Sequence, residues 1–295
     1  MCLPSLAVLQ HTGHPLIVCG RPWAQALTAQ FQAAEFISLS GKFMTDHNAV
    51  GQLPRRTRHQ ALGLIMPDSF SSAALFALNG IASCGYRDDG RSLLLRHASR
   101  KPDHPVHAVR KWWLLTRFAL NQWHMAAPGE ANEGPTEVRL KLREADRLQA
   151  QQALQTLALE QKPFVLVAPT ATGRHRGQVK VWPHFEALAQ RLKRQGLEVV
   201  MCPPRHEREQ ALQTCPSARL LDPLPLGAFC ALTQMANVVV CNDSGVSHLA
   251  AVSGANQLTL FGVTDPKFTG PWSDRAQQLG ALGQWPSLAK VSDRV

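Results

Sequence analysis

The stretch ANVVVCNDSGVSHLAAVSG, residues 236–254, decides how this chain folds. Its first part, ANVVVCN (236–242), is a short apolar run rich in β-branched residues, which predicts a buried strand. The next part, VSHLAAVS (246–253), predicts a helix, so Asp243, Ser244 and Gly245 must make the whole turn between them. A strand that passes into a helix with almost no loop is typical of parallel α/β sheets.

The same alternation runs through the rest of the chain. Strands are expected at 16–20, 36–39, 61–67, 83–86, 164–169, 197–203, 218–222, 236–242 and 257–262. Helices are expected at 3–10, 22–32, 70–80, 104–123, 183–195, 205–214, 226–235 and 246–253. The pattern predicts an α/β fold of two Rossmann-like domains, with parallel sheets covered by helices and a ligand cleft between them at the carboxyl ends of the strands.

A segment rich in glycine, proline and glutamate, AAPGEANEGPTE (126–137), separates the two halves, and a charged helical stretch follows at about 139–160. Such composition marks a domain boundary. We therefore expect an N-terminal domain at 1–127, a linker with a connecting helix at 128–160, and a C-terminal domain at 161–295.

Composition limits the classes of function. The 295 residues are 45% hydrophobic and 18% charged, with a formal net charge of +10. This charge favours an anionic partner, which can be a phosphorylated small molecule, an acidic lipid surface or a nucleic acid; a merely soluble basic surface is the alternative. No zinc-finger or RNP-like pattern favours nucleic acid, and no apolar run approaches the roughly 20 residues of a membrane-spanning helix.

The seven cysteines contain no CxxC pair, and several lie inside apolar runs such as LIVCG (16–20). This arrangement predicts free, buried thiols in a reducing cytosol. The twelve histidines form no metal-binding motif, so we expect no metal.

The turn at Asp243–Gly245 can hold an anion, because exposed N–H groups and the helix dipole meet there. The alternative is an ordinary helix cap made by Ser244 or Asp243. A second basic element, TATGRHRGQVKVWPHF (170–185), follows the strand FVLVAP and contains Arg174, His175, Arg176 and Lys180. Together the two segments predict a diphosphate clamp, although a solvated basic loop is the competing interpretation.

The motifs KVWP (180–183), DSGVSH (243–248) and LTLFGVTDP (258–266) stand in an order that resembles the bacterial lipopolysaccharide heptosyltransferases, glycosyltransferase family 9, which have the two-domain GT-B fold. The segment MPDSFSSAALFALNGIASCGYRDDGRSLLL (66–95) is similar to the heptosyltransferase II branch, with Asp68 in place of the usual Asn. The resemblance implies that this segment faces the acceptor.

The resemblance also implies roles for single residues. Leu224 would lie against the nucleotide base, and Glu207 would bind the ribose hydroxyls. The donor phosphates would be held by Thr170, Thr172, Lys180, Asp243, Ser244 and Gly245, with His248 nearby.

The opening CLPSLAVLQHTGHPLIVCG (2–20) is similar to the first helix of the family and the strand after it. The first strand of the family and its Gly-Asp turn, which carries the general-base Asp, would then lie upstream of Met1. We therefore expect a truncated or start-misassigned family member whose N-terminal sheet lacks its central first strand, so that the neighbouring strands are unpaired. Asp68 is the one substitute base considered.

The resemblance implies an inverting, metal-independent transfer of heptose from ADP-heptose to the lipopolysaccharide inner core. The implied partners are the nucleotide sugar, an anionic lipopolysaccharide-core glycolipid and the surface of the anionic inner membrane, with no cofactor and no nucleic acid. The expected location is cytoplasmic, peripheral on that membrane. A transferase that uses another nucleotide sugar and an inactive nucleotide-sugar-binding remnant are the alternatives.

Overall fold

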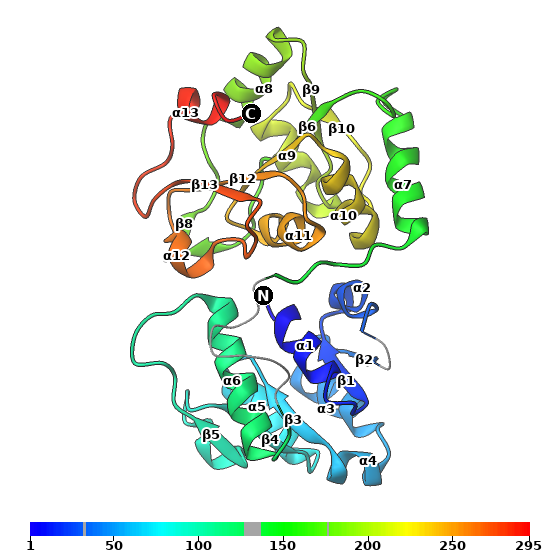
Figure 1. Cartoon of the computed structure of the whole chain (residues 1–295), viewed down its shortest axis with the longest axis vertical. Coiled ribbons are helices and arrows are strands. Elements are labelled where there is room, and N and C mark those ends of the chain that lie inside the picture. The colour runs from blue at the N-terminus through cyan, green and yellow to red at the C-terminus, as the bar shows by residue number, and fades with distance from the viewer. Residues whose placement is uncertain (32–33, 127–136, 176) are drawn as a thin grey trace. The chain divides into compact units, whose positions relative to one another are not determined.

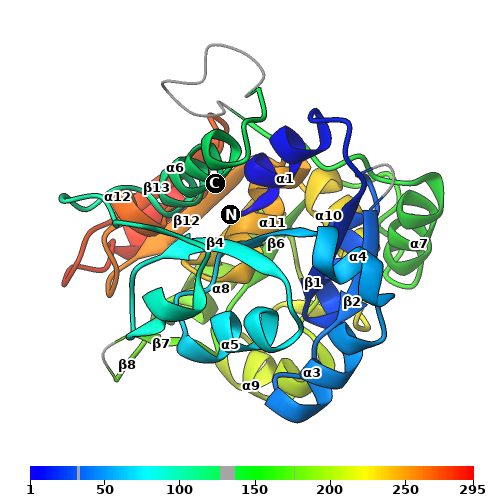
Figure 2. The ribbon, with the colours of Figure 1, turned by 90° about the horizontal axis from the view of Figure 1, so that it is seen from below.

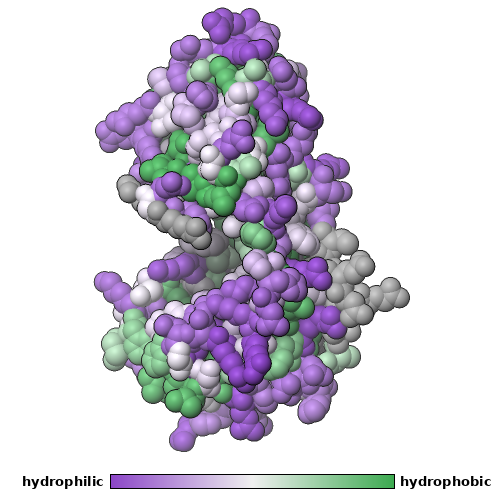
Figure 3. All heavy atoms as spheres, turned by 90° about the vertical axis from the view of Figure 1, so that its left-hand side faces the viewer, coloured by the Kyte–Doolittle hydropathy of each residue, from purple (hydrophilic) through white to green (hydrophobic). Residues whose placement is uncertain are grey.

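The computed structural model describes residues 1–31, 34–126, 137–175 and 177–295. They form two compact units, Met1–Val138 and Arg139–Val295 (Figure 1). The division falls inside the predicted connecting segment 128–160. Much of the surface visible in Figure 3 is hydrophilic on both units, with apolar patches on each of them.

Unit 1 is built on short parallel strands with helices around them. Its strands are β1 (Leu16–Gly20), β2 (Ala34–Ser38), β3 (Leu62–Ile65), β4 (Ala82–Tyr86) and β5 (His97–Ser99). Its helices are α1 (Leu3–Gln10), α2 (Gln25–Thr28), α3 (Phe43–Gly51), α4 (Arg55–Gln60), α5 (Phe70–Leu78) and α6 (Ala108–Gln122), with 3₁₀ turns η1 (Pro22–Ala24) and η2 (Arg91–Leu94). Figures 1 and 2 both show α1 beside α6, where Val8 packs with Trp113 and Leu120.

The strands of unit 1 form two separate pieces, β1–β2 and β3–β4–β5, and all pairs are parallel. Within the described ranges no ladder joins β1 to β3, so each of them has a strand neighbour on one side only. Cys19 of β1 packs against the cluster that contains Val50 and Leu75, and Ile65 of β3 belongs to a second cluster; Phe76 of α5 packs against both. All five residues of β1 are only half-buried.

Two predictions for unit 1 need correction. The expected helix 22–32 is the turn η1 followed by α2, which ends at Thr28, and residue 32 lies outside the described part of the chain. The helices α3 and α4 were not predicted. The sequence of α4, RRTRHQ, has no apolar residue, so it lacks the apolar stripe by which a helix is recognised.

Unit 2 contains one parallel sheet of six strands. They are β6 (Phe164–Ala168), β9 (Glu198–Met201), β10 (Arg219–Leu220), β11 (Val238–Asn242), β12 (Gln257–Phe261) and β13 (Ala276–Gly280). A hairpin of β7 (Arg174–His175) and β8 (Gln178–Val179) stands apart from them. The helices are α7 (Glu144–Gln155), α8 (Phe185–Arg194), α9 (Arg208–Thr214), α10 (Leu226–Met235), α11 (Gly245–Ser253), α12 (Pro266–Thr269) and α13 (Leu288–Ser292), with the 3₁₀ turn η3 (Arg205–Glu207).

Both faces of this sheet are covered, as predicted. Alternate residues of β11 enter two different cores: Val240 packs with α8 on one face, and Val239 and Cys241 pack with α7 and α10 on the other. All seven cysteines are free, and five of them are buried. The predicted connecting helix is shorter than 139–160. It begins at Glu144, and Leu140 before it donates its N–H to the carbonyl of Val252 over 2.7 Å. This helix therefore belongs to unit 2.

Candidate nucleotide-sugar site

The strand order of unit 2 creates a switch point between β6 and β11. The order is β10-β9-β6-β11-β12-β13, so the chain winds outward from β6 on one side and then returns to β11 on the other side. In sheets of this kind, ligands bind outside the carboxyl ends of the strands at the switch point. The predicted phosphate-binding residues follow these two strands: Thr170 and Lys180 come after β6, and Asp243 comes directly after β11.

Lys180 reaches from the loop after β6 to the turn after β11. Its Nζ donates a hydrogen bond to the backbone carbonyl of Asp243 over 2.7 Å and lies 3.6 Å from the carboxylate oxygen Oδ2 of the same residue. Gly173 lies alongside, because a Cβ on it would meet Lys180 Cε at 3.6 Å. The structure thus brings the two predicted motifs together, with the ammonium group directly before the start of α11.

Asn242 joins these segments, and the sequence analysis missed it. Its side chain is fully buried. Its Oδ1 accepts a hydrogen bond from the N–H of Trp182 over 2.9 Å, and its Nδ2 donates to the carbonyls of Ala168 and Thr170 over 3.3 and 3.4 Å. The available signal was its position, as a polar residue that ends the apolar strand VVVCN. Such a residue needs buried partners.

Trp182 fixes the other end of the KVWP motif. Its indole is fully buried, and its Nε1 donates to the carbonyl of Pro286 over 2.8 Å. The rings of His184 and Phe185 meet the indole edge-on, each with centroids 5.4 Å away. Trp182 therefore holds the loop while Lys180, two residues earlier, stays at the site.

The Asp243 carboxylate serves as an attachment point for the loop after β12. Its Oδ2 accepts hydrogen bonds from the hydroxyl groups of Thr264 over 2.6 Å and Thr269 over 3.2 Å. Neither threonine was predicted to lie at the site, although Thr264 begins the TDP of the motif LTLFGVTDP (258–266). The Asp243 carboxylate is thus bonded to the two threonines. The backbone carbonyl of Asp243 accepts the hydrogen bond from Lys180 and so positions that lysine at the site.

The start of α11 is not an ordinary side-chain cap. Ser244 has the extended backbone of an N-cap, but no side chain caps this nine-residue helix, and the buried Oγ of Ser244 has no hydrogen-bond partner within the described residues. A Cβ on Gly245 would meet no atom within 4 Å. The alternative interpretation, a side-chain cap made by Ser244 or Asp243, is therefore not observed, and a helix start without such a cap favours an anion.

The remaining predicted residues of unit 2 lie around this point. Thr170 is buried, and its hydroxyl donates to Oε2 of Glu207, which belongs to η3 after β9. Thr172 is exposed. Leu224 is half-buried against the core that includes α10, and His248 is half-buried in the first turn of α11. The structure tests none of the ligand contacts implied for them.

Asp68 lies in unit 1, between β3 and α5, and is surrounded by cations. Lys111 Nζ and Lys101 Nζ lie 2.7 and 3.0 Å from its Oδ2, and Arg91 Nη2 lies 3.7 Å from its Oδ1. Burial raises the pKa of the Asp68 carboxyl, but the hydrogen bonds and charges of the two lysines outweigh it and lower the pKa below its ordinary value. A carboxylate with a lowered pKa is a weaker general base.

The helix start without a side-chain cap and the lysine lie at the switch point of a doubly wound parallel sheet, which places the chain among the α/β proteins whose ligands bind at the carboxyl ends of the strands. The chain belongs to glycosyltransferase family 9 (heptosyltransferase), whose sequence model matches residues 51–293.

Three relatives show how far the likeness extends. The chain is 27% identical to lipooligosaccharide heptosyltransferase 2 of Haemophilus influenzae over 73% of this chain and 64% of that protein. It is 26% identical to lipopolysaccharide heptosyltransferase 2 of Escherichia coli K12 over 77% and 66%. It thus spans just under two thirds of these curated relatives. The solved E. coli ADP-heptose lps heptosyltransferase II has a TM-score of 0.72 at 22% identity, covering 95% of this chain and 87% of that one. This likeness confirms the predicted GT-B class of fold.

Proposed function

We propose that this protein transfers heptose from ADP-heptose to a lipopolysaccharide inner-core acceptor. The observation that carries the proposal is the position of Lys180 beside the uncapped start of α11 at the switch point of unit 2. The names of its relatives, which are heptosyltransferases of lipopolysaccharide and lipooligosaccharide, support this choice of donor and acceptor.

In the proposed reaction an acceptor hydroxyl attacks the anomeric carbon of the donor in line with the departing group. The new C–O bond forms as the bond to the diphosphate breaks, the configuration inverts, and ADP leaves with the electron pair. A base accepts the hydroxyl proton. Lys180 and the N–H groups of Gly245 and Val246 stabilise the charge that develops on the diphosphate. These groups supply the positive charge that a metal ion would otherwise provide, so we propose a transfer without a metal or cofactor.

The net charge of +10 supports an anionic glycolipid as acceptor and contact with an anionic inner membrane from the cytoplasmic side. No helix in the described residues is long and apolar enough to cross a membrane. We propose no nucleic-acid partner.

Calorimetric titration with ADP-heptose tests the donor site. Lys180→Ala removes the one ammonium group seen to bridge the two motifs, so we expect donor affinity to fall about tenfold or more. Lys162→Ala is the matched control, because Lys162 is an exposed lysine before β6. Equal affinity in the two variants would contradict the proposed role of Lys180.

A nucleotide-sugar-binding protein without transferase activity is the second candidate. It is favoured by Asp68, the one base candidate, because ion pairs with two lysines lower its pKa. A transferase for another nucleotide sugar also fits, since the phosphate-binding groups do not contact the sugar. Mass spectrometry of the products formed from a panel of nucleotide sugars separates these cases. Donor binding without product identifies the binding protein.

A further inference from the structure

A basic surface lies in unit 1 at the edge opposite the carboxyl ends of its strands. We call it the α4 face and define it as Arg55, Arg56, Arg58 and His59 of α4 together with His47 of α3. The helix α4 leads directly into the amino end of β3, and Gly80, which precedes the amino end of β4, lies against His59, since a Cβ on Gly80 would meet the imidazole at 3.4 Å. This face is therefore remote from the loops that follow β3 and β4, which include Asp68.

The positive charge of this face is not neutralised. Helix α3 contains Asp46, but its buried carboxylate accepts hydrogen bonds from the N–H groups of Ser40 and Gly41. From His47 to Gly80 the only further acidic residue in the sequence is Asp68, which lies at the other edge of the sheet. Within the described chain, none of the three arginines has an ion pair with a carboxylate. Arg55 and Arg56 are exposed, and Arg55 Nε is 3.4 Å from His59 Nε2. Clustered cations without counter-charges favour an anionic partner.

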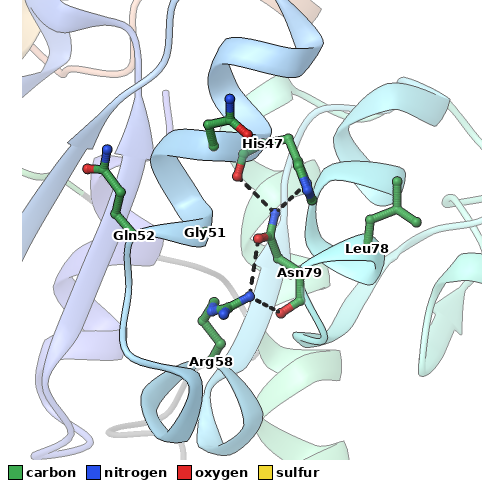
Figure 4. Close-up of a pocket in the computed structure, with 7 residues that line it drawn as sticks. His47, Gly51, Gln52, Arg58, Leu78 and Asn79 are labelled. Carbon is green, nitrogen blue, oxygen red and sulfur yellow. Dashed lines mark hydrogen bonds between the residues drawn. The ribbon is translucent and has the colours of Figure 1, made fainter.

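A pocket of about 430 Å³ opens on this face, lined by residues of α3, α4 and the end of α5 (Figure 4). Arg58 Nε donates to the carbonyl of Leu53, and its Nη1 donates to the carbonyl of Asn79 over 3.2 Å. These bonds offset the negative end of α5, and they leave Nη2 without a hydrogen bond among the described residues. The pocket thus contains a guanidinium group that is fixed in place and whose Nη2 can still donate hydrogen bonds.

His47 adds a second donor. The amide Nδ2 of Asn79 lies 2.9 Å from Nδ1 of His47 and donates to it, as the dashed line in Figure 4 shows. Because an amide NH2 group can only donate, Nδ1 accepts this bond and the other ring nitrogen, Nε2, carries the hydrogen. Asn79 is buried and also donates to the carbonyl of Leu75 over 2.9 Å, which fixes its orientation.

Apolar side chains are exposed beside these cations. Leu78, which lines the pocket, is 66% exposed, and Leu62, two residues after α4, is 47% exposed. A basic surface with exposed leucines suits the interface of an anionic bilayer, where cations contact phosphates and apolar groups enter the acyl boundary. Nucleic-acid binding would gain nothing from the leucines.

We propose that the α4 face docks on a bilayer of anionic phospholipids, with the pocket receiving one headgroup phosphate between Arg58 and His47. The inference rests on the proposed function in one respect, that the protein works at the surface of an anionic membrane. It assigns that contact to a specific surface of unit 1, whose residues differ from those of the donor site in unit 2.

Flotation of the full chain with vesicles tests this inference. We expect binding to vesicles of phosphatidylcholine mixed with phosphatidylglycerol and none to phosphatidylcholine alone. The double variant Arg55→Gln/Arg56→Gln should bind the mixed vesicles roughly thirtyfold more weakly. Lys162→Gln/Arg194→Gln removes two exposed cations from unit 2 and should bind like the unchanged protein. Leu78→Ser should weaken binding without changing the net charge.

Equal vesicle binding by the two double variants would overturn the proposal, as would failure of the unchanged protein to bind anionic vesicles. Binding of a single-stranded RNA at the same salt concentration without vesicle binding would assign the face to nucleic acid and also overturn it. ADP-heptose titration of the same preparations keeps the two proposals distinct. Loss of vesicle binding with intact donor binding concerns the α4 face alone, whereas loss of donor binding concerns unit 2.

Discussion

At the residue scale, the candidate site depends on a few side chains that hold one another. Asn242 fixes the loop after β6, and the Asp243 carboxylate holds the loop after β12. Lys180 donates a hydrogen bond to the backbone carbonyl of Asp243. The sequence motifs identified Lys180 and Asp243. They could not identify Asn242 or Thr264 as partners, because these contacts join segments that are far apart in the chain.

A substitution of Gly245 should affect ligand binding without affecting the stability of the fold. A Cβ at this position meets no protein atom within 4 Å, so Gly245→Ala should leave the melting temperature within about 2 °C of the unchanged protein. The added methyl group would, however, occupy the place where a phosphate approaches the start of α11. We therefore expect ADP-heptose affinity to fall about tenfold in a calorimetric titration. Unchanged affinity together with unchanged stability would show that the donor does not approach this turn.

At the element scale, apolar periodicity predicted most strands and helices of unit 2, since buried parallel strands such as β11 are continuous apolar runs. Elements without that pattern were missed. The helix α4 has no apolar residue, and β13, AQQLG, is mostly polar. Strand β13 forms by pairing with β12, and Arg58 of α4 donates to the carbonyls of Leu53 and Asn79. A local sequence pattern does not show such contacts.

The two sheets should differ in their protection from hydrogen exchange. Strand β11 is buried and paired on both sides, whereas β1 is half-buried and paired with β2 only. We expect amide exchange in β1 to be at least about a hundredfold faster than in β11, because less of the structure must open to expose it. Exchange measured by mass spectrometry at neutral pH checks this. Equal protection of the two strands would mean that the edge of β1 is covered in solution.

At the scale of the whole molecule, the chain contains one complete doubly wound unit and one whose sheet is in two pieces. The doubly wound unit, unit 2, carries the residues proposed to bind the donor. Unit 1 carries the Asp68 cluster at the carboxyl ends of its strands and the α4 face at the opposite edge. The composition predicted the need for an anionic partner, but only the structure shows that the cations of α4 lack carboxylate partners. A count of charges cannot reveal which of them are paired.

The central claim is that the diphosphate of a nucleotide sugar binds at the switch point of unit 2. A crystal structure of the full chain with ADP-heptose tests it most directly. The account predicts diphosphate oxygens within hydrogen-bonding distance of Lys180 Nζ and of the backbone N–H groups of Gly245 and Val246. A diphosphate bound elsewhere, with Lys180 still bonded only to Asp243, would contradict it.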